Sequence, residues 1–249
     1  MGKPTRSQRR LVIWVSLIVY AVLISWLFRE RYSVVRVEEA PPNPVVVSQP
    51  EPQKTPVAPT VPASALLEVP FMVQAPFGVW DALHQETCEE ASLMMVHAFR
   101  TERSLGTLQT IDDELKALVA WQTARGYEYD VTLAELSRIA RDYYSMNTGR
   151  IITNPTITDI QSEIAAGRPV IVPAAGRLLE NPNFTRGGPS YHMLVVRGYD
   201  ANGFITNDPG TRRGEKFRYS YKNLMDSIRD WTGSKATILS GAKAVLVFD

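Results

Sequence analysis

An apolar run near the N-terminus divides this chain before any other feature does. Residues 11–28 contain no charged side chain, no glycine and no proline. At about 1.5 Å per residue, a helix over this run would be roughly 27 Å long, close to the bilayer's hydrocarbon core of about 30 Å. Trp26 lies near one end, where an aromatic ring would meet the membrane interface. The sequence therefore predicts one transmembrane helix over residues 11–28, preceded by a basic tail over residues 1–10.

A cleaved signal peptide is the alternative interpretation of the same run. The run is long for a signal peptide, and Arg29, Glu30 and Arg31 follow it where a cleavage site of small residues would be expected. Four basic residues precede the run and three follow it, an excess that predicts a cytoplasmic N-terminus. We therefore expect a single-pass membrane protein whose folded part is extracytoplasmic.

Two further segments follow the apolar run. Between residues 40 and 65 the chain holds eight prolines among valine, threonine, glutamine and alanine. Such a segment cannot bury a core and favours extended polyproline II structure, so it predicts a Pro-rich, semi-rigid linker over residues 29–65. Residues 66–249 are then left for one folded domain, a length that suits a single compact core.

Composition excludes several classes of site. The 27 basic and 26 acidic residues nearly balance, and no basic cluster is interleaved with aromatics, which argues against nucleic acid as a partner. The chain has one cysteine, Cys88, and three histidines, His84, His97 and His192. One cysteine allows neither an internal disulfide nor a cysteine-rich metal site, and the histidines lack the spacing of a zinc motif. We therefore expect no metal and no other cofactor.

Helical patterns fill the first half of the domain. Thr87 and Glu90 have the spacing of a capping box, and apolar residues follow them, so we predict that a helix begins here. Apolar residues recur at helical spacing over three further segments, residues 112–123, 132–144 and 158–166.

Strand patterns fill the second half. Short runs rich in β-branched residues, bounded by glycine, asparagine and aspartate, lie at residues 168–173, 191–197, 203–207 and 244–248. Helices followed by strands predict an α+β domain in which a helical lobe packs on an antiparallel sheet.

A cysteine at the start of a helix has a special electrostatic environment. Free backbone N–H groups and the helix dipole stabilise an anion there, which favours the thiolate of Cys88. Glu89 and Glu90 oppose this effect with their negative charge. A reactive thiolate at this position therefore needs a nearby imidazolium, which would also protonate the leaving group.

His192 is the best candidate for that partner. It lies in a predicted strand, on the same face as Leu194 and Val196. A turn and a second strand follow and end at Asp208, so a hairpin would bring Asp208 to the imidazole and fix its tautomer. Cys88 and His192 are distant in sequence, but such pairs meet only in the fold.

A reaction at a peptide carbonyl also needs a donor for the oxyanion, typically a side-chain amide beside the backbone N–H of the nucleophile. Two glutamines, Gln74 and Gln85, precede Cys88. The residues alone leave both open as this donor.

The residues around these candidates resemble a known family. Val-Pro-Phe-Met-Val-Gln-Ala-Pro-Phe-Gly at residues 69–78 and Cys-Glu-Glu-Ala-Ser at residues 88–92 are similar to the front of the bacteriocin-processing (double-glycine) peptidase-like family. Residues 192–198 and Asp208-Pro209 resemble its second half, with a histidine on one strand and an Asp-Pro pair at the end of the next. This family belongs to the papain-like cysteine peptidases.

The resemblance implies a papain-like fold and the hydrolysis of peptide bonds through an acyl-enzyme intermediate. It implies Cys88 as nucleophile, His192 as general base and acid, and Asp208 as the residue that orients the imidazole. It implies Gln74 as the oxyanion donor. The expected partners are a peptide or protein substrate and, through the N-terminal helix, a membrane.

Other interpretations stay open at this stage. A cell-wall amidase or endopeptidase, or an acyl transferase, would use the same groups on the same scaffold. Glu89 beside the cysteine favours a third interpretation, a non-catalytic module that binds peptides. We expect no catalytic role for His84 or His97. The loop over residues 177–190 is either a flap over the cleft or a surface excursion.

Overall fold

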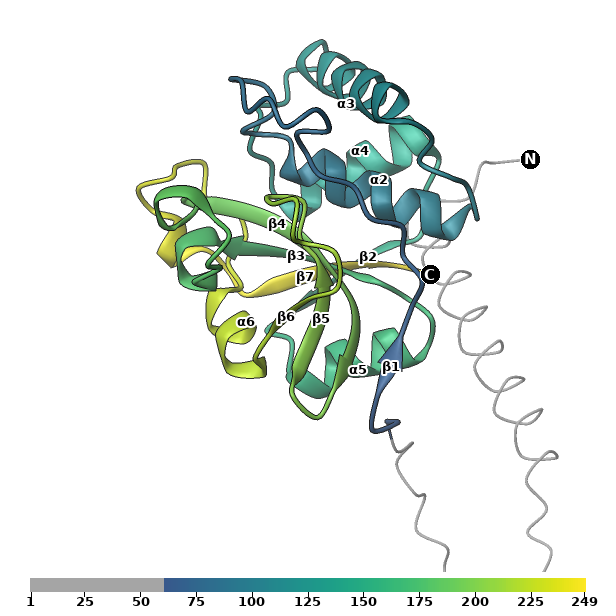
Figure 1. Ribbon diagram of the computed structural model, residues 1–249, viewed down its shortest axis with the longest axis vertical. Helices are drawn as coiled ribbons and strands as arrows, with labels where there is room; N and C mark the ends of the chain where they lie inside the picture. Colours follow the sequence, from purple (N-terminus) through teal and green to yellow (C-terminus); the bar gives the residue numbers. More distant parts are fainter. Residues whose placement is uncertain (1–60) are drawn as a thin grey trace, which may run out of the picture. The chain divides into compact units, whose positions relative to one another are not determined.

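The computed structural model describes residues 61–249 of the chain (Figure 1). The predicted transmembrane helix, the basic tail and most of the predicted linker lie outside these residues. Within them, no helix combines the length and the apolar character needed to cross a bilayer.

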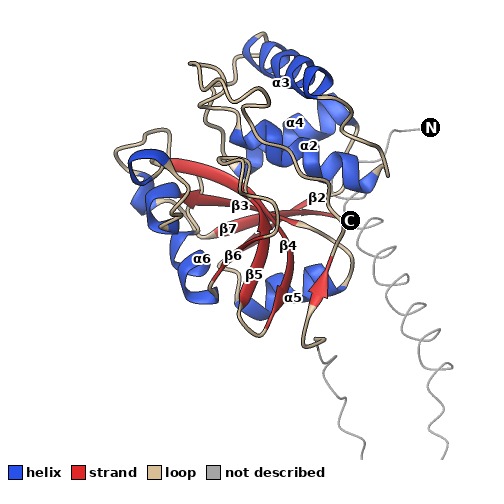
Figure 2. Ribbon diagram, viewed as in Figure 1, coloured by secondary structure: helices blue, strands red, loops and turns tan. Residues whose placement is uncertain are grey.

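A seven-stranded antiparallel sheet organises the domain (Figure 2). Its order is β2-β7-β3-β4-β5-β6, and β1 pairs with β4 beside this path. The strands are β1 (Ala65–Leu66), β2 (Gly149–Thr153), β3 (Val170–Ala175), β4 (Tyr191–Asp200), β5 (Gly203–Asn207), β6 (Phe217–Tyr219) and β7 (Ala244–Phe248). The predicted antiparallel sheet is confirmed.

Helices cover both faces of this sheet, as Figure 1 shows. On one face lie α2 (Cys88–Arg100), α3 (Leu108–Thr123) and α4 (Leu133–Tyr144). On the other face lie α5 (Ile157–Ala165) and α6 (Tyr221–Ser227). Three short 3-10 helices lie in the connections: η1 (Gly176–Leu179), η2 (Thr185–Gly187) and η3 (Ile238–Ser240).

Side-chain alternation along β4 separates two hydrophobic clusters. Met193 and Val195 belong to the cluster under α2, α3 and α4, which we call the α2-side cluster. Leu194 and Val196 belong to the cluster over α5 and α6, the α5-side cluster. All four side chains are fully buried, and burying one such side chain is worth about 1.5–3 kcal/mol. The fold is therefore held from both faces of its central strand.

The sequence predicted the main elements but not their distribution. The predicted helix over residues 158–166 corresponds to α5, which lies on the face opposite the other predicted helices. The structure adds β1, β2, β6 and α6, which were not predicted. Among residues 61–249, strand β2 pairs only with β7, and its residues are mostly exposed, so it lacks the apolar run used to find strands.

The capping box predicted at the start of α2 is wrong. Thr87 is the N-cap residue, but its side chain makes no capping hydrogen bond. Its hydroxyl donates instead to the backbone carbonyl of Gln74 at 3.2 Å, and both carboxylate oxygens of Glu90 are buried without a partner among the described residues. Real capping boxes occur at α4 and α5, with Thr132 and Thr156 as the N-cap residues.

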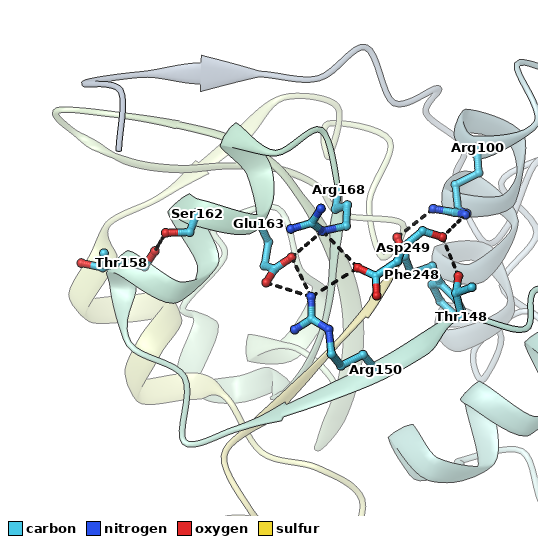
Figure 3. A network of polar contacts seen from close by, with 9 residues as sticks. All are labelled: Arg100, Thr148, Arg150, Thr158, Ser162, Glu163, Arg168, Phe248 and Asp249. Atoms are coloured by element: carbon cyan, nitrogen blue, oxygen red, sulfur yellow. Dashed lines mark hydrogen bonds and ion pairs between the residues drawn. The ribbon is translucent and has the colours of Figure 1, made fainter. Parts of the chain in front are cut away.

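A polar network joins the end of β7 to α2, β2 and α5 (Figure 3). The carboxylate of Glu163 accepts from Arg150 at 3.0 Å and from Arg168 at 2.6 Å. The same two arginines lie 3.4 Å from the Asp249 carboxylate. Arg100 donates to the main-chain carbonyl groups of residues 248 and 249. These contacts fix the sheet edge on the side where α2 ends.

Candidate active site

Cys88 is the first residue of α2, as the sequence predicts, but its environment is dry and acidic. The residue is only 4% exposed and belongs to the α2-side cluster. Its thiol donates a hydrogen bond to Glu89 Oε2 at 3.0 Å. Burial raises the pKa of the Cys88 thiol well above its usual value, and the charge of Glu89 raises it further. In this arrangement the sulfur holds its proton.

Two more carboxyl groups, those of Glu90 and Asp130, share this environment with Glu89. Burial raises the pKa of Glu89 well above its usual value and that of Glu90 to about 7. Burial also raises the pKa of Asp130, although Lys235, 3.5 Å away, opposes this effect. The charges of Glu89, Asp130 and Glu90 all raise the pKa of the Cys88 thiol further, so these carboxyl groups disfavour a thiolate.

The β4–β5 hairpin joins His192 to Asp208. His192 Nε2 lies 2.8 Å from Asp208 Oδ1, and both side chains are buried. Val195 pairs with Asn207 across the hairpin, so the next step of the register sets Asp208 opposite Leu194. Leu194 and His192 share one strand face, and the carboxylate therefore reaches the ring diagonally. Because a carboxylate only accepts hydrogen bonds, Nε2 carries the proton and Nδ1 is left free for a second partner.

Asp208 is held by three further donors. Its Oδ2 accepts from the Tyr219 hydroxyl at 2.6 Å and from Asn181 Nδ2 at 3.1 Å. Its Oδ1 also accepts from the backbone N–H of Gly210 at 3.0 Å. Burial alone would raise the pKa of Asp208, but the charge of His192 and these hydrogen bonds outweigh burial and lower it. The carboxylate is thus kept ionised and in one orientation.

Sequence reasoning missed Tyr219 and Asn181. Tyr219 reaches Asp208 because β6 pairs with β5, and β6 is only three residues long. Asn181 lies in the connection between β3 and β4 and donates to the Tyr219 hydroxyl as well, at 2.7 Å. No local pattern marks either residue, since both roles depend on pairings between distant segments.

The loop over residues 177–190 covers the imidazole. The Phe184 ring meets the His192 ring edge to face, with centroids 5.3 Å apart. Glycines allow close approach from two sides: a Cβ at Gly210 would lie 2.8 Å from His192 Cε1, and one at Gly176 would lie 3.1 Å from His192 Cβ. His192 is consequently only 1% exposed.

The two candidate oxyanion donors have different environments. Gln74 is buried, and its side-chain Nε2 donates to the backbone carbonyl of His84 at 2.9 Å. Gln85 is exposed, and its side-chain amide is bound to the carbonyl of Trp80 at 2.8 Å. The backbone of Gln74 also receives the Thr87 hydroxyl and donates to the carbonyl of Pro209 at 3.0 Å. Gln74 thus touches the residue before Cys88 and the residue after Asp208.

The sulfur and the imidazole do not form a hydrogen bond within residues 61–249. Cys88 is bonded to Glu89, and His192 to Asp208. His192 shares its strand face with Leu194 and Val196, as predicted, and these belong to the α5-side cluster, whereas Cys88 packs in the α2-side cluster. The structure therefore brings His192, Asp208 and the Gln74 backbone together, whereas the Cys88 thiol lies in the α2-side cluster and is turned to Glu89.

The side chains of the remaining histidines have other partners. His97 stacks on Tyr144, with ring centroids 4.1 Å apart, toward the far end of α2. His84 is bound between two aspartates. Among the described residues, no group of three or more histidine, cysteine or acidic side chains is arranged to hold a metal ion.

Comparison with known proteins identifies the family. The model of the Peptidase C39-like family matches residues 66–238. A Bacillus anthracis protein of known crystal structure, suggested to be a C39-like peptidase, aligns with 75% of this chain and 98% of its own at 16% identity and a TM-score of 0.48. No curated protein sequence matches the chain. On the strength of the family match, which covers nearly all of the folded domain, the chain belongs to the Peptidase C39-like family and is a cysteine peptidase.

Proposed function

We propose that the protein hydrolyses peptide bonds with a triad of Cys88, His192 and Asp208 and with Gln74 as oxyanion donor. The observation that carries the proposal is the position of Gln74. Its backbone is bonded to Thr87, directly before Cys88, and to Pro209, directly after Asp208. Gln74 therefore connects the residue before the proposed nucleophile with the residue after Asp208, the proposed orienting residue of the base.

Each group then has one role in the reaction. His192 Nδ1 takes the proton of the Cys88 thiol, since Nε2 is engaged by Asp208. The thiolate attacks the peptide carbonyl, and the Cys88 backbone N–H and the Gln74 amide stabilise the oxyanion. His192 returns the proton to the leaving amine, and the acyl-enzyme remains. A water molecule, deprotonated by His192, releases the acid and restores the thiol.

Because the Cys88 thiol is bonded to Glu89, we interpret the described arrangement as the resting state of the enzyme. Under this proposal the thiol must first break its hydrogen bond to Glu89 and turn toward the imidazole. Phe184 covers the His192 ring, so its displacement would give a substrate access to the imidazole. We therefore place a rearrangement of the thiol before the chemical step.

The place of action follows from the sequence outside the described residues. The apolar run at residues 11–28 would anchor the enzyme, and the Pro-rich linker would hold the domain away from the bilayer. The basic residues before the run favour a cytoplasmic N-terminus and an extracytoplasmic peptidase domain. The substrate is then a peptide or protein outside the membrane.

The decisive experiment compares Cys88→Ala and His192→Ala with the wild type on a peptide library and on purified cell wall. Both variants should fold, as circular dichroism would establish, and both should lose turnover of the same substrate. His97→Ala is the matched control and should retain it. Full activity in both site variants would contradict the proposal. If the wild type released stem peptides from purified cell wall but cleaved no peptide of the library, the substrate would be peptidoglycan.

A further inference from the structure

His84 lies between two carboxylates on different elements. Its Nδ1 is 2.8 Å from Asp81 Oδ1, and its Nε2 is 2.8 Å from Asp112 Oδ1. The His84 and Asp112 side chains are 7% and 5% exposed. Asp112 belongs to α3 and also binds Lys116 Nζ through its other oxygen, at 2.6 Å. The segment before Cys88 is thereby attached to the α3 helix through one imidazole.

Both ring nitrogens of His84 lie at hydrogen-bond distance from a carboxylate oxygen. Because ionised carboxylates only accept hydrogen bonds, the ring makes both contacts at once only when both of its nitrogens carry a proton. Hydrogen bonds from the His84 backbone and ring lower the pKa of Asp81, and the bond from Lys116 lowers that of Asp112, which keeps both carboxylates ionised. The charged groups that face His84 are therefore Asp81, Asp112 and, behind Asp112, Lys116.

The backbone of His84 carries the link to the active site. Its carbonyl accepts from Gln74 Nε2 at 2.9 Å. Gln74 Oε1 is buried without a hydrogen-bond partner among the described residues. The hydrogen bond to the His84 carbonyl thus fixes the orientation of the Gln74 side-chain amide, with Nε2 on the side of that carbonyl. One N–H is used by that carbonyl, and the second remains for a developing oxyanion.

We propose that His84 is a positioning residue of the peptidase: its doubly bonded ring fixes the loop before Cys88, and its carbonyl orients the Gln74 amide for the oxyanion. This inference rests on the proposed function of Gln74. It gives a role to a histidine for which the sequence predicted none.

The first test replaces His84 with glutamine, which keeps much of the volume but cannot carry a charge or donate from both ends. Loss of an oxyanion donor typically lowers kcat by about 100- to 1000-fold. A displaced donor should cost less, so we expect His84→Gln to lower kcat by about 10- to 100-fold and to change KM less than about threefold. His97→Gln is the matched control and should leave both values unchanged. Asp112→Asn, which keeps the shape but not the charge, should show the same selective loss of kcat.

The second test asks whether His84 acts through Gln74. Gln74→Ala should lower kcat on its own, and the double variant with His84→Gln should be no slower than Gln74→Ala by more than about twofold. Independent, multiplying losses would overturn the inference, because His84 would then act by another route. A loss that appears as a raised KM or as unfolding in both His84→Gln and Asp112→Asn would overturn it as well.

The third test separates this inference from the proposed function. The Gln74 side-chain amide signal, identified by its disappearance in Gln74→Ala, is followed by nuclear magnetic resonance. It should move in His84→Gln and stay in place in His97→Gln. An inactive wild type would remove the proposed function while a shifted signal still supports the positioning. An unshifted signal would overturn the positioning whatever the activity.

Discussion

Replacement of Glu89 by glutamine should make Cys88 more reactive. In the structure the thiol is bonded to Glu89 Oε2 at 3.0 Å in a buried setting. The thiol form satisfies this contact, whereas a thiolate would face a carboxylate across the same distance. Glu89→Gln keeps the shape of the side chain and removes the charge that penalises the thiolate.

The size of the effect follows from the strength of such a contact. A hydrogen bond to a charged group is worth about 1.5–3 kcal/mol. One pKa unit corresponds to about 1.4 kcal/mol, so loss of this bond should lower the pKa of the Cys88 thiol by about one to two units. Burial, the largest cause of the raised pKa, is unchanged by the substitution. The variant thiol should therefore still titrate above a free cysteine thiol in the absence of substrate.

Alkylation by iodoacetamide measures this directly, because Cys88 is the only cysteine in the chain. The rate is followed from pH 6 to pH 10 and fitted for its midpoint. Below both midpoints the thiolate fraction rises about 10- to 100-fold, but a less basic thiolate is also a weaker nucleophile. The net rate should rise by roughly three- to tenfold.

Glu86→Gln is the matched control, since it removes the same charge two positions before Cys88 from a residue that binds Lys235 at the surface. Its midpoint should equal that of the wild type. Equal midpoints for Glu89→Gln and the wild type would refute the reasoning. A wild-type midpoint below that of free cysteine would refute it more directly, because the resting sulfur would then already be paired with an imidazolium.

Three further predictions test other parts of the structure. Tyr219→Phe removes a 2.6 Å donor from Asp208 and should lower kcat about tenfold, whereas Tyr221→Phe should not; steady-state kinetics decides, and equal values would contradict the role of Tyr219. Glu163→Gln weakens two arginine contacts that are partly open to solvent, so urea unfolding should show a loss of about 1 kcal/mol, and no loss would mean that the network is not stabilising. Deletion of residues 1–28 should move the protein from the membrane to the soluble fraction with its peptide turnover intact; retention at the membrane would contradict the anchor.

The parts of the site that were predictable are those built from neighbouring strands. His192 lies on β4 and Asp208 directly follows β5 of the same hairpin, so the alternation of side chains and the length of the turn were sufficient to bring them together. Asn181 and Tyr219 complete the same cluster from segments that approach only in the folded sheet. No sequence pattern around Asn181 or Tyr219 predicts that these residues approach Asp208.

The choice between Gln74 and Gln85 shows the same limit. Both precede Cys88 in the sequence, and nothing in their spacing separates them. The structure distinguishes them because Gln74 is buried between Thr87 and Pro209, whereas Gln85 is exposed and bound to Trp80. Prediction of this difference required the path of the loop over residues 75–87, in which His84 is bonded to Asp112 of α3.

Two opposing effects act on the protonation of Cys88: the helix N-terminus favours the thiolate, and burial favours the thiol. The sequence indicates only the first effect, which is the smaller one. A helix N-terminus stabilises an anion by about 0.3–1 kcal/mol, and by about 2 kcal/mol in favourable sites. Full burial can shift a pKa by up to three to five units, roughly 4–7 kcal/mol, and Glu89 adds to it. The effect of burial on the Cys88 thiol therefore outweighs that of the helix N-terminus, although the position at the start of α2 alone predicts a thiolate. It follows that Cys88 is a neutral thiol at rest. Under the proposed function, the step that exposes the sulfur to His192 then controls the reaction, and substitutions of Phe184 and Glu89 should change the rate more than any change in the helix dipole.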